Sequence, residues 1–534
     1  MLYKVFCACC QGIEAVLVTV EVDISPGISF YLVGLPDNAV KESQQRIGAA
    51  LGHYGYRIPG RKIIINMAPA DMKKEGSAFD ITIAIGILCA SGQIPDDKIP
   101  QERLSRFIIM GELALDGTLR KFTGALPIAA QAAKLGFQAC IFPEESAEEC
   151  AEIDDITIFG AGNIQDVIEI LCSPETACHH IANNREGCIS KPGSNSNIFY
   201  SPTTCPPHEY DFADIKGQTK AKFGMEIAAA GNHNIILTGS PGCGKSLLAK
   251  SLPSILPPLS KKEAVETSKI YSVAGLLSQQ HGFIKRRPFR SPHHTATISS
   301  LTGGGNNGAP GEISLANNGV LFLDEFCEFS RSAIEILRQP MEDGEILISR
   351  VRHKYRYPAN FMLVATMNPC PCGFYGSEGN RCSCSSHAIS RYLSHLSGPI
   401  LDRIDLQIFM KPVTTCELTG ISSNTASPPP ECSATIAARV LKAREIQYHR
   451  FKNEQFCTNS RIPSSQLEHF CKIGSNERKF LESIVNKLGL SARSYARLLK
   501  ISRTIADLDG EDFISLAHIS KALQFRNLNS FLMR

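Results

Sequence analysis

The sequence predicts an α/β protein built around a parallel sheet. Three observations predict this fold: a glycine-rich loop follows the apolar run 235–237, a second apolar run ends in Asp324 and Glu325, and a third ends just before Asn368. Short continuous apolar runs are typical of buried parallel strands, and ligands of open α/β sheets collect at the carboxyl ends of the strands. We therefore expect the three segments to share one sheet edge.

The glycine-rich loop reads GSPGCGKS and fits the pattern GxxxxGK[ST]. Its glycines let backbone N–H groups curl around an anion, Lys245 can reach the β and γ phosphates, and Ser246 can offer its hydroxyl to Mg²⁺. Taken alone, the pattern also fits an accidental glycine-rich turn. The residues expected to bind ATP are Gly239, Ser240, Pro241, Gly242, Cys243, Gly244, Lys245, Ser246 and Asp324.

The polar residues after the other two runs are expected to complete this site. Asp324 is predicted to hold Mg²⁺ together with Ser246, directly or through water, and Glu325 to polarise the attacking water. The alternative for Glu325 is a surface carboxylate at a strand end. Asn368 is predicted to orient the water or the γ phosphate.

Two arginines are candidates for stabilising the charge that develops during phosphoryl transfer. Arg403 lies in the segment LDRID, and Arg493 lies at the start of a predicted helix. Either residue could instead form an ordinary salt bridge.

The chain of 534 residues is too long for one core and is expected to fold as several domains. Residues 1–172 alternate strand-like segments (15–22, 62–66) with helix-like ones (81–88, 126–135). Polar linkers are predicted at 173–209 and 414–434. They flank the nucleotide-binding core, 210–413, and precede a helical domain, 435–534, with helical spacing at 441–451, 477–488, 492–508 and 514–525.

Composition is that of an ordinary globular protein, with 43% hydrophobic residues and a net charge of +3. The last hundred residues hold 17 Lys and Arg against 9 Asp and Glu, a balance of +8, which leaves −5 for the rest of the chain. This basic tail is the expected place of a polyanion contact. No apolar run reaches the length of a membrane span and no secretion signal is recognisable, so we expect a cytoplasmic protein without membrane contact.

Most of the 20 cysteines are irregularly placed, as expected for reduced thiols in a reducing compartment. Four of them form two CxC pairs around a glycine-rich turn, where one tetrahedral Zn²⁺ could collect their sulfurs; four reduced thiols are the alternative. These four are Cys370, Cys372, Cys382 and Cys384. The adjacent His293 and His294 are expected to support backbone or phosphate rather than a metal.

Together these motifs resemble an AAA+ ATPase of the magnesium-chelatase-like branch. More narrowly, the stretches RPFRSPHH (287–294) and PGEISLA (310–316) resemble the ComM/YifB family. The resemblance implies Asn368 as sensor 1, Arg403 as an arginine finger acting on a neighbour's ATP, Arg493 as sensor 2, and a hexameric ring. It also makes the basic segments 285–290 and 350–357 candidates for contact with a phosphate backbone and stacked bases; a solvated charged hairpin is the alternative.

In the first 172 residues, the segments 73–87, 111–117 and 136–143 resemble the Lon-type protease domain, which has a ribosomal S5 domain 2-like α/β fold. Such a peptidase needs a serine nucleophile and a lysine base. Ala78 stands at the serine position, one residue after Ser77, and Leu126 stands near the lysine position. We therefore expect the catalytic dyad to be absent and the domain to serve scaffolding, ring assembly or DNA contact.

The expected function is that of a ring-forming ATP hydrolase, a DNA helicase or branch-migration motor in recombination or natural transformation. Its expected cofactors are ATP and Mg²⁺, with structural Zn²⁺ as a further candidate, and its expected partners are single-stranded or branched DNA and copies of itself. The alternatives are a chelatase-like AAA+ ATPase that remodels a protein partner and a nucleotide-gated binding module with little turnover.

Overall fold

The computed structural model of the protein describes residues 2–183, 209–277, 283–305, 308–349, 354–376, 382–413 and 430–526. Most of the two predicted linkers, 173–209 and 414–434, lies outside these ranges, as does the tip of the basic segment at 350–353. None of the described helices combines the length and the apolar character that crossing a membrane requires.

The amino-terminal part forms a seven-stranded mixed sheet in the order β3-β4-β2-β1-β5-β8-β9. Its strands are β1 (Leu2–Gln11), β2 (Glu14–Ser25), β3 (Ser29–Val33), β4 (Lys62–Ala68), β5 (Phe107–Ile109), β8 (Ala139–Pro143) and β9 (Thr157–Ala161), with a small separate pair, β6 (Glu112–Leu113) and β7 (Leu119–Arg120). Its helices are α1 (Asn38–Lys41), α2 (Ser43–His53), α3 (Asp80–Ala90), α4 (Gln101–Leu104), α5 (Ala125–Lys134), α6 (Glu144–Glu148) and α7 (Ile164–Cys172).

The strands and helices predicted in this part are confirmed as β2, β4, α3 and α5. Nearly every residue of α3 is buried, because the helix packs directly onto β1 and β2. Gly86 permits the close approach, since a Cβ at this position would lie 2.7 Å from Cγ2 of Val22.

The central part contains a five-stranded, fully parallel sheet in the order β11-β14-β17-β10-β18. The strands are β10 (Ile235–Gly239), β11 (Phe289–Arg290), β14 (Val320–Leu323), β17 (Met362–Met367) and β18 (Leu406–Met410). Two small hairpins accompany it, β12 (Gly303–Gly304) with β13 (Ala309–Pro310) and β15 (Glu345–Ser349) with β16 (Lys354–Pro358). The helices are α8 (Thr219–Gly231), α9 (Lys245–Ser251), α10 (Lys261–Val273), α11 (Ile298–Thr302), α12 (Glu312–Leu315), α13 (Arg331–Glu335), α14 (Arg338–Asp343), α15 (Ser386–Leu393) and α16 (Gly398–Leu401).

Both faces of this sheet are covered, which explains why its strands are mostly apolar. In β10, Ile235 and Leu237 enter a core that includes the carboxyl-terminal helices, whereas Ile236 enters a second core under the β15–β16 hairpin. Alternate side chains of a strand point to opposite faces, so a strand buried on both sides needs apolar residues throughout. The predicted α/β class with a parallel sheet is confirmed.

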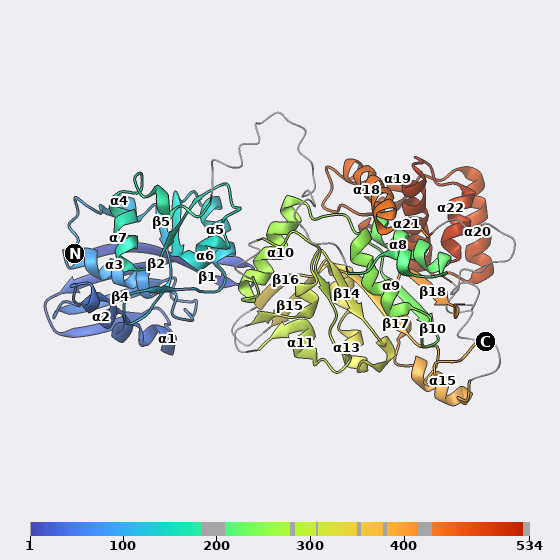
Figure 1. The fold of residues 1–534 in the computed structure, drawn as a ribbon, viewed down its shortest axis with the longest axis horizontal. Helices are drawn as coiled ribbons and strands as arrows, with labels where there is room; N and C mark the ends of the chain where they lie inside the picture. The colour runs from blue at the N-terminus through green and yellow to red at the C-terminus, as the bar shows by residue number, and fades with distance from the viewer. Residues whose placement is uncertain are drawn as a thin grey trace.

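The carboxyl-terminal part consists of helices that pack against one end of the central part (Figure 1). They are α18 (Ser433–Arg450), α19 (Leu467–Phe470), α20 (Ser475–Leu488), α21 (Ala492–Asp509) and α22 (Leu516–Leu523). The four predicted helical segments fall in α18, α20, α21 and α22. Helix α8 contacts both α18 and α21 and so joins this part to the parallel sheet.

Helix α10 connects the amino-terminal and central parts, as Figure 1 shows. It begins at a capping box in which Ser260 and Glu263 satisfy each other's backbone N–H groups. Near its end, the Ser272 carbonyl accepts from Gly124 N (3.2 Å), and the Ser272 hydroxyl donates to Glu149 (3.1 Å). Because Glu149 also pairs with Lys121 (2.8 Å), a polar network joins α10 to the start of α5.

Candidate nucleotide-binding site

The glycine-rich loop joins β10 to α9 at the carboxyl edge of the parallel sheet. Gly242 (φ +78°) and Gly244 (φ +88°) have left-handed backbone conformations that favour glycine. Gly239 has a steric reason instead, since a Cβ there would lie 2.6 Å from the Met410 carbonyl oxygen. The loop therefore leaves α9 with its amino end directed at the loop, the arrangement that binds phosphate.

Lys245 is held within this loop by three oxygen atoms. Its Nζ donates to the carbonyls of Gly239 (2.7 Å) and Ser240 (3.0 Å) and to Oδ1 of Asn368 (3.1 Å). Burial lowers the pKa of Lys245, and the nearby Asp324 and Glu325 carboxylates act against this lowering. The structure thus brings together Lys245 and Asn368, which are 123 positions apart in the sequence.

Ser246 and Asp324 meet as a metal site requires. The Ser246 hydroxyl donates to Oδ2 of Asp324 over 2.9 Å, so two oxygens suited to Mg²⁺ face each other beside the loop. The other carboxylate oxygen, Oδ1, accepts from Thr366 Oγ1 and from the backbone N–H of Glu325 (3.1 Å). The residues present therefore fit a magnesium ion whose carboxylate ligand is oriented by its neighbours.

Glu325 lies beside Asp324 in an unusual backbone conformation (φ +52°). Its side chain is about half exposed, and Oε2 lies 3.6 Å from Nδ1 of His294. A left-handed non-glycine residue costs of order 1–3 kcal/mol and persists only where its surroundings hold it. The backbone N–H of Glu325, which donates to Thr366 Oγ1 (3.3 Å), is one such restraint.

The sequence did not predict the contacts that Thr366 and His294 make in this site. Thr366 is the one polar residue in the buried strand β17, and that exception was the available signal. The prediction for His294 covered only backbone or phosphate support, and nothing in the local sequence indicated that it lies against Glu325.

Arg403 and Arg493 are not brought to this edge of the sheet. Arg403 precedes β18, and its carbonyl accepts from the Asn234 side chain (3.2 Å) at the amino-terminal start of β10. The glycine-rich loop follows the other end of the same strand, five residues away, which corresponds to about 15 Å. In this structure both arginines lie at the amino edge, away from the loop of their own chain.

Both arginines share one carboxylate. Arg403 is buried, and its guanidinium lies 2.5 Å from Oε1 of Glu342; Arg493 is 61% exposed and lies 4.0 Å from the same oxygen. Beside them is a cavity of about 320 Å³ lined by further cationic side chains. These are Arg461, Arg497 and Lys500.

The four cysteines of the two CxC pairs converge next to the nucleotide site. The Sγ atom of Cys370 lies 3.3 Å from that of Cys372 and 3.7 Å from that of Cys382, and Cys372 and Cys382 are 3.6 Å apart. The sulfur of Cys384 also lies within 4.8 Å of the others. The positions of the four sulfur atoms are therefore compatible with the prediction that these residues hold one ion.

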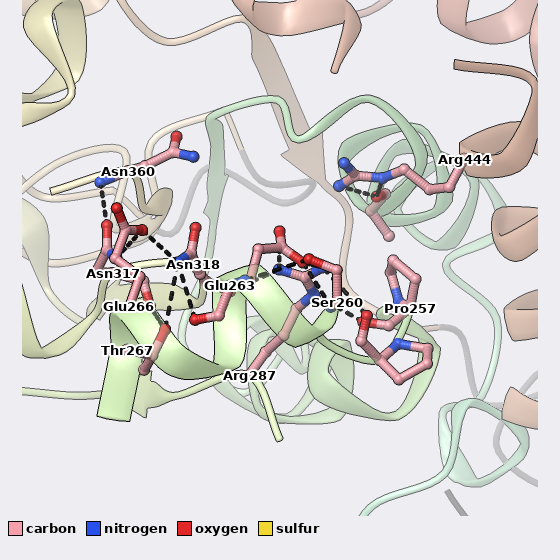
Figure 2. A network of polar contacts seen from close by, with 12 residues as sticks. Pro257, Ser260, Glu263, Glu266, Thr267, Arg287, Asn317, Asn318, Asn360 and Arg444 are labelled. Carbon is pink, nitrogen blue, oxygen red and sulfur yellow. Dashed lines mark hydrogen bonds and ion pairs between the residues drawn. The ribbon is translucent and has the colours of Figure 1, made fainter. Parts of the chain in front are cut away.

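The basic segment at 285–290 is largely engaged inside the molecule. Figure 2 shows Arg287 between Glu263 and the loop before α10: it donates to the carbonyls of Pro257 and Asn318 (2.7 Å each) and pairs with Glu263 (3.2 Å). Arg290 pairs with Glu312 (2.7 Å). Each of these two arginines neutralises a carboxylate of the same chain, and contact of the segment with DNA stays a prediction.

The β15–β16 hairpin differs from that segment. Arg356 lies 3.6 Å from Glu345 but is 71% exposed, and Lys354 is also exposed. Tyr357, which had been considered for base stacking, is buried and donates to the Gly308 carbonyl (2.8 Å). Residues 350–353, part of the same prediction, lie outside the described residues.

Several arginines of the basic tail are also paired within the chain. Arg439 binds Glu226 (2.6 Å), Arg450 and Arg503 bind Asp507, and Arg444 is buried against the Ala229 carbonyl. The +8 balance therefore overstates the positive surface of the tail. Among the described residues of the tail, four exposed cations lie on or beside α20, at Lys472, Arg478, Lys479 and Lys487, and four lie elsewhere, at Lys442, Lys452, Arg493 and Lys521.

In the amino-terminal part, Ala78 is half-buried and Leu126 is fully buried in the core. Ser77 is engaged by Glu112, and Lys74, the nearby lysine, donates to the Pro69 carbonyl. The two positions aligned with a serine and lysine dyad thus hold an alanine and a core leucine.

Comparison with known proteins agrees with this geometry. The family described as magnesium chelatase, subunit ChlI, matches residues 211–418; the descriptions subunit ChlI of Mg-chelatase and magnesium chelatase, subunit ChlI C-terminal, match residues 20–146 and 430–526. The chain is similar to competence protein ComM of Haemophilus influenzae, with 42% identity covering 98% of this chain and 97% of the relative. It is also similar to the YifB protein of Escherichia coli (41%, covering 98% and 96%) and, over 36% of its length, to the magnesium-chelatase 67 kDa subunit of Heliobacterium mobile (26%, covering 32% of that subunit).

Proposed function

The chain belongs to the ComM/YifB family of magnesium-chelatase-like proteins, and on this premise we propose that it is a ring-forming AAA+ ATPase that acts as a DNA motor. One observation carries the proposal. The phosphate-binding loop and the two arginines suited to phosphoryl transfer occupy opposite edges of one sheet. A complete hydrolytic site then needs two protomers, with Arg403 and Arg493 supplied by a neighbour.

At the carboxyl edge, this chain's residues divide the work of hydrolysis. The loop amides and Lys245 bind the phosphates, Asn368 orients Lys245 and the γ phosphate, and Glu325 accepts a proton from the attacking water. Ser246 and Asp324 would hold Mg²⁺, which neutralises phosphate charge when bound. Thr366 fixes the Asp324 carboxylate in the required orientation.

The remaining exposed cations favour a polyanion as the partner of the motor. Lys354 and Arg356 on the β15–β16 hairpin, together with the cluster at α20, suit a phosphate backbone. The named relative ComM, a competence protein, favours DNA taken up or recombined over a protein partner. We therefore assign single-stranded or branched DNA as the substrate, a hexamer as the assembly, and the cytoplasm as the location.

The amino-terminal part is assigned a scaffolding role. We propose that it has the Lon-type protease fold without peptidase activity, and that residues 435–534 are the lid of the ATPase, following the domain limits expected above. Zn²⁺ at the four cysteines is proposed as a third cofactor.

DNA-stimulated ATP hydrolysis at increasing salt tests the function. A motor on a phosphate backbone should hydrolyse ATP faster with single-stranded or branched DNA, and its DNA affinity should fall steeply with salt. Lys245→Ala should abolish turnover and is the control for contaminating ATPase. A chelatase-like remodeller of proteins would show neither stimulation nor salt dependence, and that result would overturn the DNA assignment.

A further inference from the structure

We propose that Cys370, Cys372, Cys382 and Cys384 bind one structural Zn²⁺ that holds the loop after β17 against the phosphate-binding loop. The first support is the spacing of the sulfurs. Four thiolates at about 2.3 Å from a central zinc lie about 3.8 Å from one another at the corners of a tetrahedron. The three separations in this cluster, 3.3, 3.6 and 3.7 Å, come close to that edge length.

A disulfide explains this arrangement less well than a metal. A disulfide joins two sulfurs at about 2.05 Å and leaves any third sulfur outside the bond. All four cysteines are free thiols, and three of them are nearly equidistant. Mutual spacing of this kind is what one shared centre requires.

The surroundings of the cluster fit a thiolate site. The backbone N–H of Tyr375 donates to Sγ of Cys370 over 3.3 Å, a contact that stabilises a metal-bound sulfur. Gly373 (φ +82°) makes the turn that brings this N–H group round. Cys370 is buried and the other three cysteines are half-buried, so an ion can enter while its ligands remain shielded.

The same loop adjoins the nucleotide site at two points. A Cβ at Gly373 would lie 2.6 Å from Cδ of Pro241, so the cysteine turn and the phosphate-binding loop are in direct contact. Asn368, which receives the hydrogen bond from Lys245, stands two residues before Cys370. Beyond the cluster, Ser385 caps α15 immediately after Cys384. A zinc ion would thus tie the end of β17 and the start of α15 together beside Pro241.

This position predicts an effect on nucleotide binding, a part of the proposal that rests on the ATP site assigned above. Without the ion, the loop loses its cross-link, and Pro241 and Asn368 lose a fixed neighbour. We expect ATP to bind about tenfold more weakly, which corresponds to about 1.4 kcal/mol.

Metal analysis of the full-length protein tests the site itself. Protein purified under reducing conditions from zinc-supplemented cells, then passed through a chelating resin, should hold about one zinc per chain. The double variant Cys382→Ser/Cys384→Ser should hold none. The matched control Cys178→Ser/Cys432→Ser, which replaces two exposed cysteines far from the cluster in sequence, should keep the ion.

Cobalt keeps the test decisive if the double variant fails to fold. Wild-type protein stripped of zinc and given Co²⁺ should show the intense visible absorption of tetrahedral thiolate-bound cobalt. Wild-type protein that contains no zinc and gives no such absorption would overturn the site.

Two further measurements distinguish a failure of the zinc site from a failure of the proposed ATP site. Lys245→Ala should retain its zinc while losing ATP turnover, so failure of the ATP site leaves the zinc result intact. ATP affinity is then measured on the zinc-free double variant, with circular dichroism as the check of folding. A folded variant that lacks zinc but binds ATP as tightly as wild type would disprove the support of the phosphate-binding loop.

Discussion

At the scale of single residues, Thr366 matters because its hydroxyl serves two neighbours at once. It donates to Oδ1 of Asp324 and accepts the backbone N–H of Glu325. The residue proposed to hold the metal and the residue proposed to activate water are therefore oriented by one side chain. Removing the hydroxyl leaves both polar groups without this partner.

We expect Thr366→Val to slow ATP turnover by about 10- to 100-fold, because a hydrogen bond to a charged group contributes roughly 1.5–3 kcal/mol. ATP affinity should change far less, since Lys245 and the loop are intact. Steady-state hydrolysis and equilibrium nucleotide binding measure the two effects. Thr366→Ser keeps the hydroxyl and should retain most of the turnover; equal loss in both variants would mean that packing matters instead.

Lys500 gives a prediction about pH. Burial lowers its pKa to about 8, although Asp405 and the other charges nearby also act on it. Between pH 8 and the ordinary lysine pKa of about 10.4, the unfolded chain therefore binds more protons at this residue than the folded chain, and folding stability gained from this group rises with pH. From pH 8 to pH 10, the melting temperature of Lys500→Met should rise less, or fall more, than the melting temperature of wild type. Identical trends would contradict the lowered pKa.

At the scale of elements, α10 makes contacts near both of its ends. Its end contacts the amino-terminal part through Ser272, and its start holds Arg287 through Glu263. Burial raises the pKa of Glu263, but Arg287 and the hydrogen bonds from Ser260 together outweigh burial, and the net pKa is lowered. Asn318, two residues before β14, donates to Glu266 on α10 (2.9 Å), as Figure 2 shows.

Arg287 and Arg356 should therefore behave in opposite ways. Arg287→Ala leaves the half-buried Glu263 carboxylate without its partner and should destabilise the protein by about 1–3 kcal/mol, with DNA affinity per folded molecule unchanged. Arg356→Ala removes an exposed charge and should weaken DNA binding and its salt dependence while leaving stability within about 0.5 kcal/mol. Denaturant unfolding and DNA titration measure both variants, and reduced DNA affinity in folded Arg287→Ala would support the basic segment as a DNA contact.

The elements that sequence predicts well are those with a local signal. The glycine pattern, the strand before Asp324 and the helical spacing of α18, α20, α21 and α22 each depend on neighbouring residues. Pairing partners have no such signal: Glu226 is 213 positions from Arg439, and Glu342 is far from both Arg403 and Arg493. For the same reason, the sequence did not indicate that Arg287 and Arg290 pair with Glu263 and Glu312.

At the scale of the whole molecule, the residues proposed for ATP hydrolysis lie at the two opposite edges of the parallel sheet. Helical periodicity predicts α21 but does not indicate which edge of the sheet it approaches. In the structure its first turn reaches the amino edge, where Arg497 pairs with Asp405 and Arg493 approaches Glu342. The proposed ring follows from this placement.

Mixing of variant subunits tests that ring. Arg403→Ala alone and Glu325→Gln alone should each lose turnover. Mixed rings should regain part of it, because some interfaces then pair an intact Glu325 with an intact Arg403. Hydrolysis is measured across mixing ratios, with Lys245→Ala/Arg403→Ala in place of Arg403→Ala as the control that cannot be rescued. Absence of rescue in stable mixed rings would refute supply of Arg403 by a neighbour.

Glu342 gives these arginines an internal counterion. In a lone protomer the carboxylate occupies Arg403 and attracts Arg493, so an incoming triphosphate has to displace it. In the proposed assembly, the neighbour's triphosphate replaces the Glu342 carboxylate as the anion beside these arginines. A subunit without bound nucleotide offers no such anion. We expect oligomerisation to respond to whether ATP or ADP is bound, because the additional phosphate of ATP can compete with Glu342 for the Arg403 guanidinium.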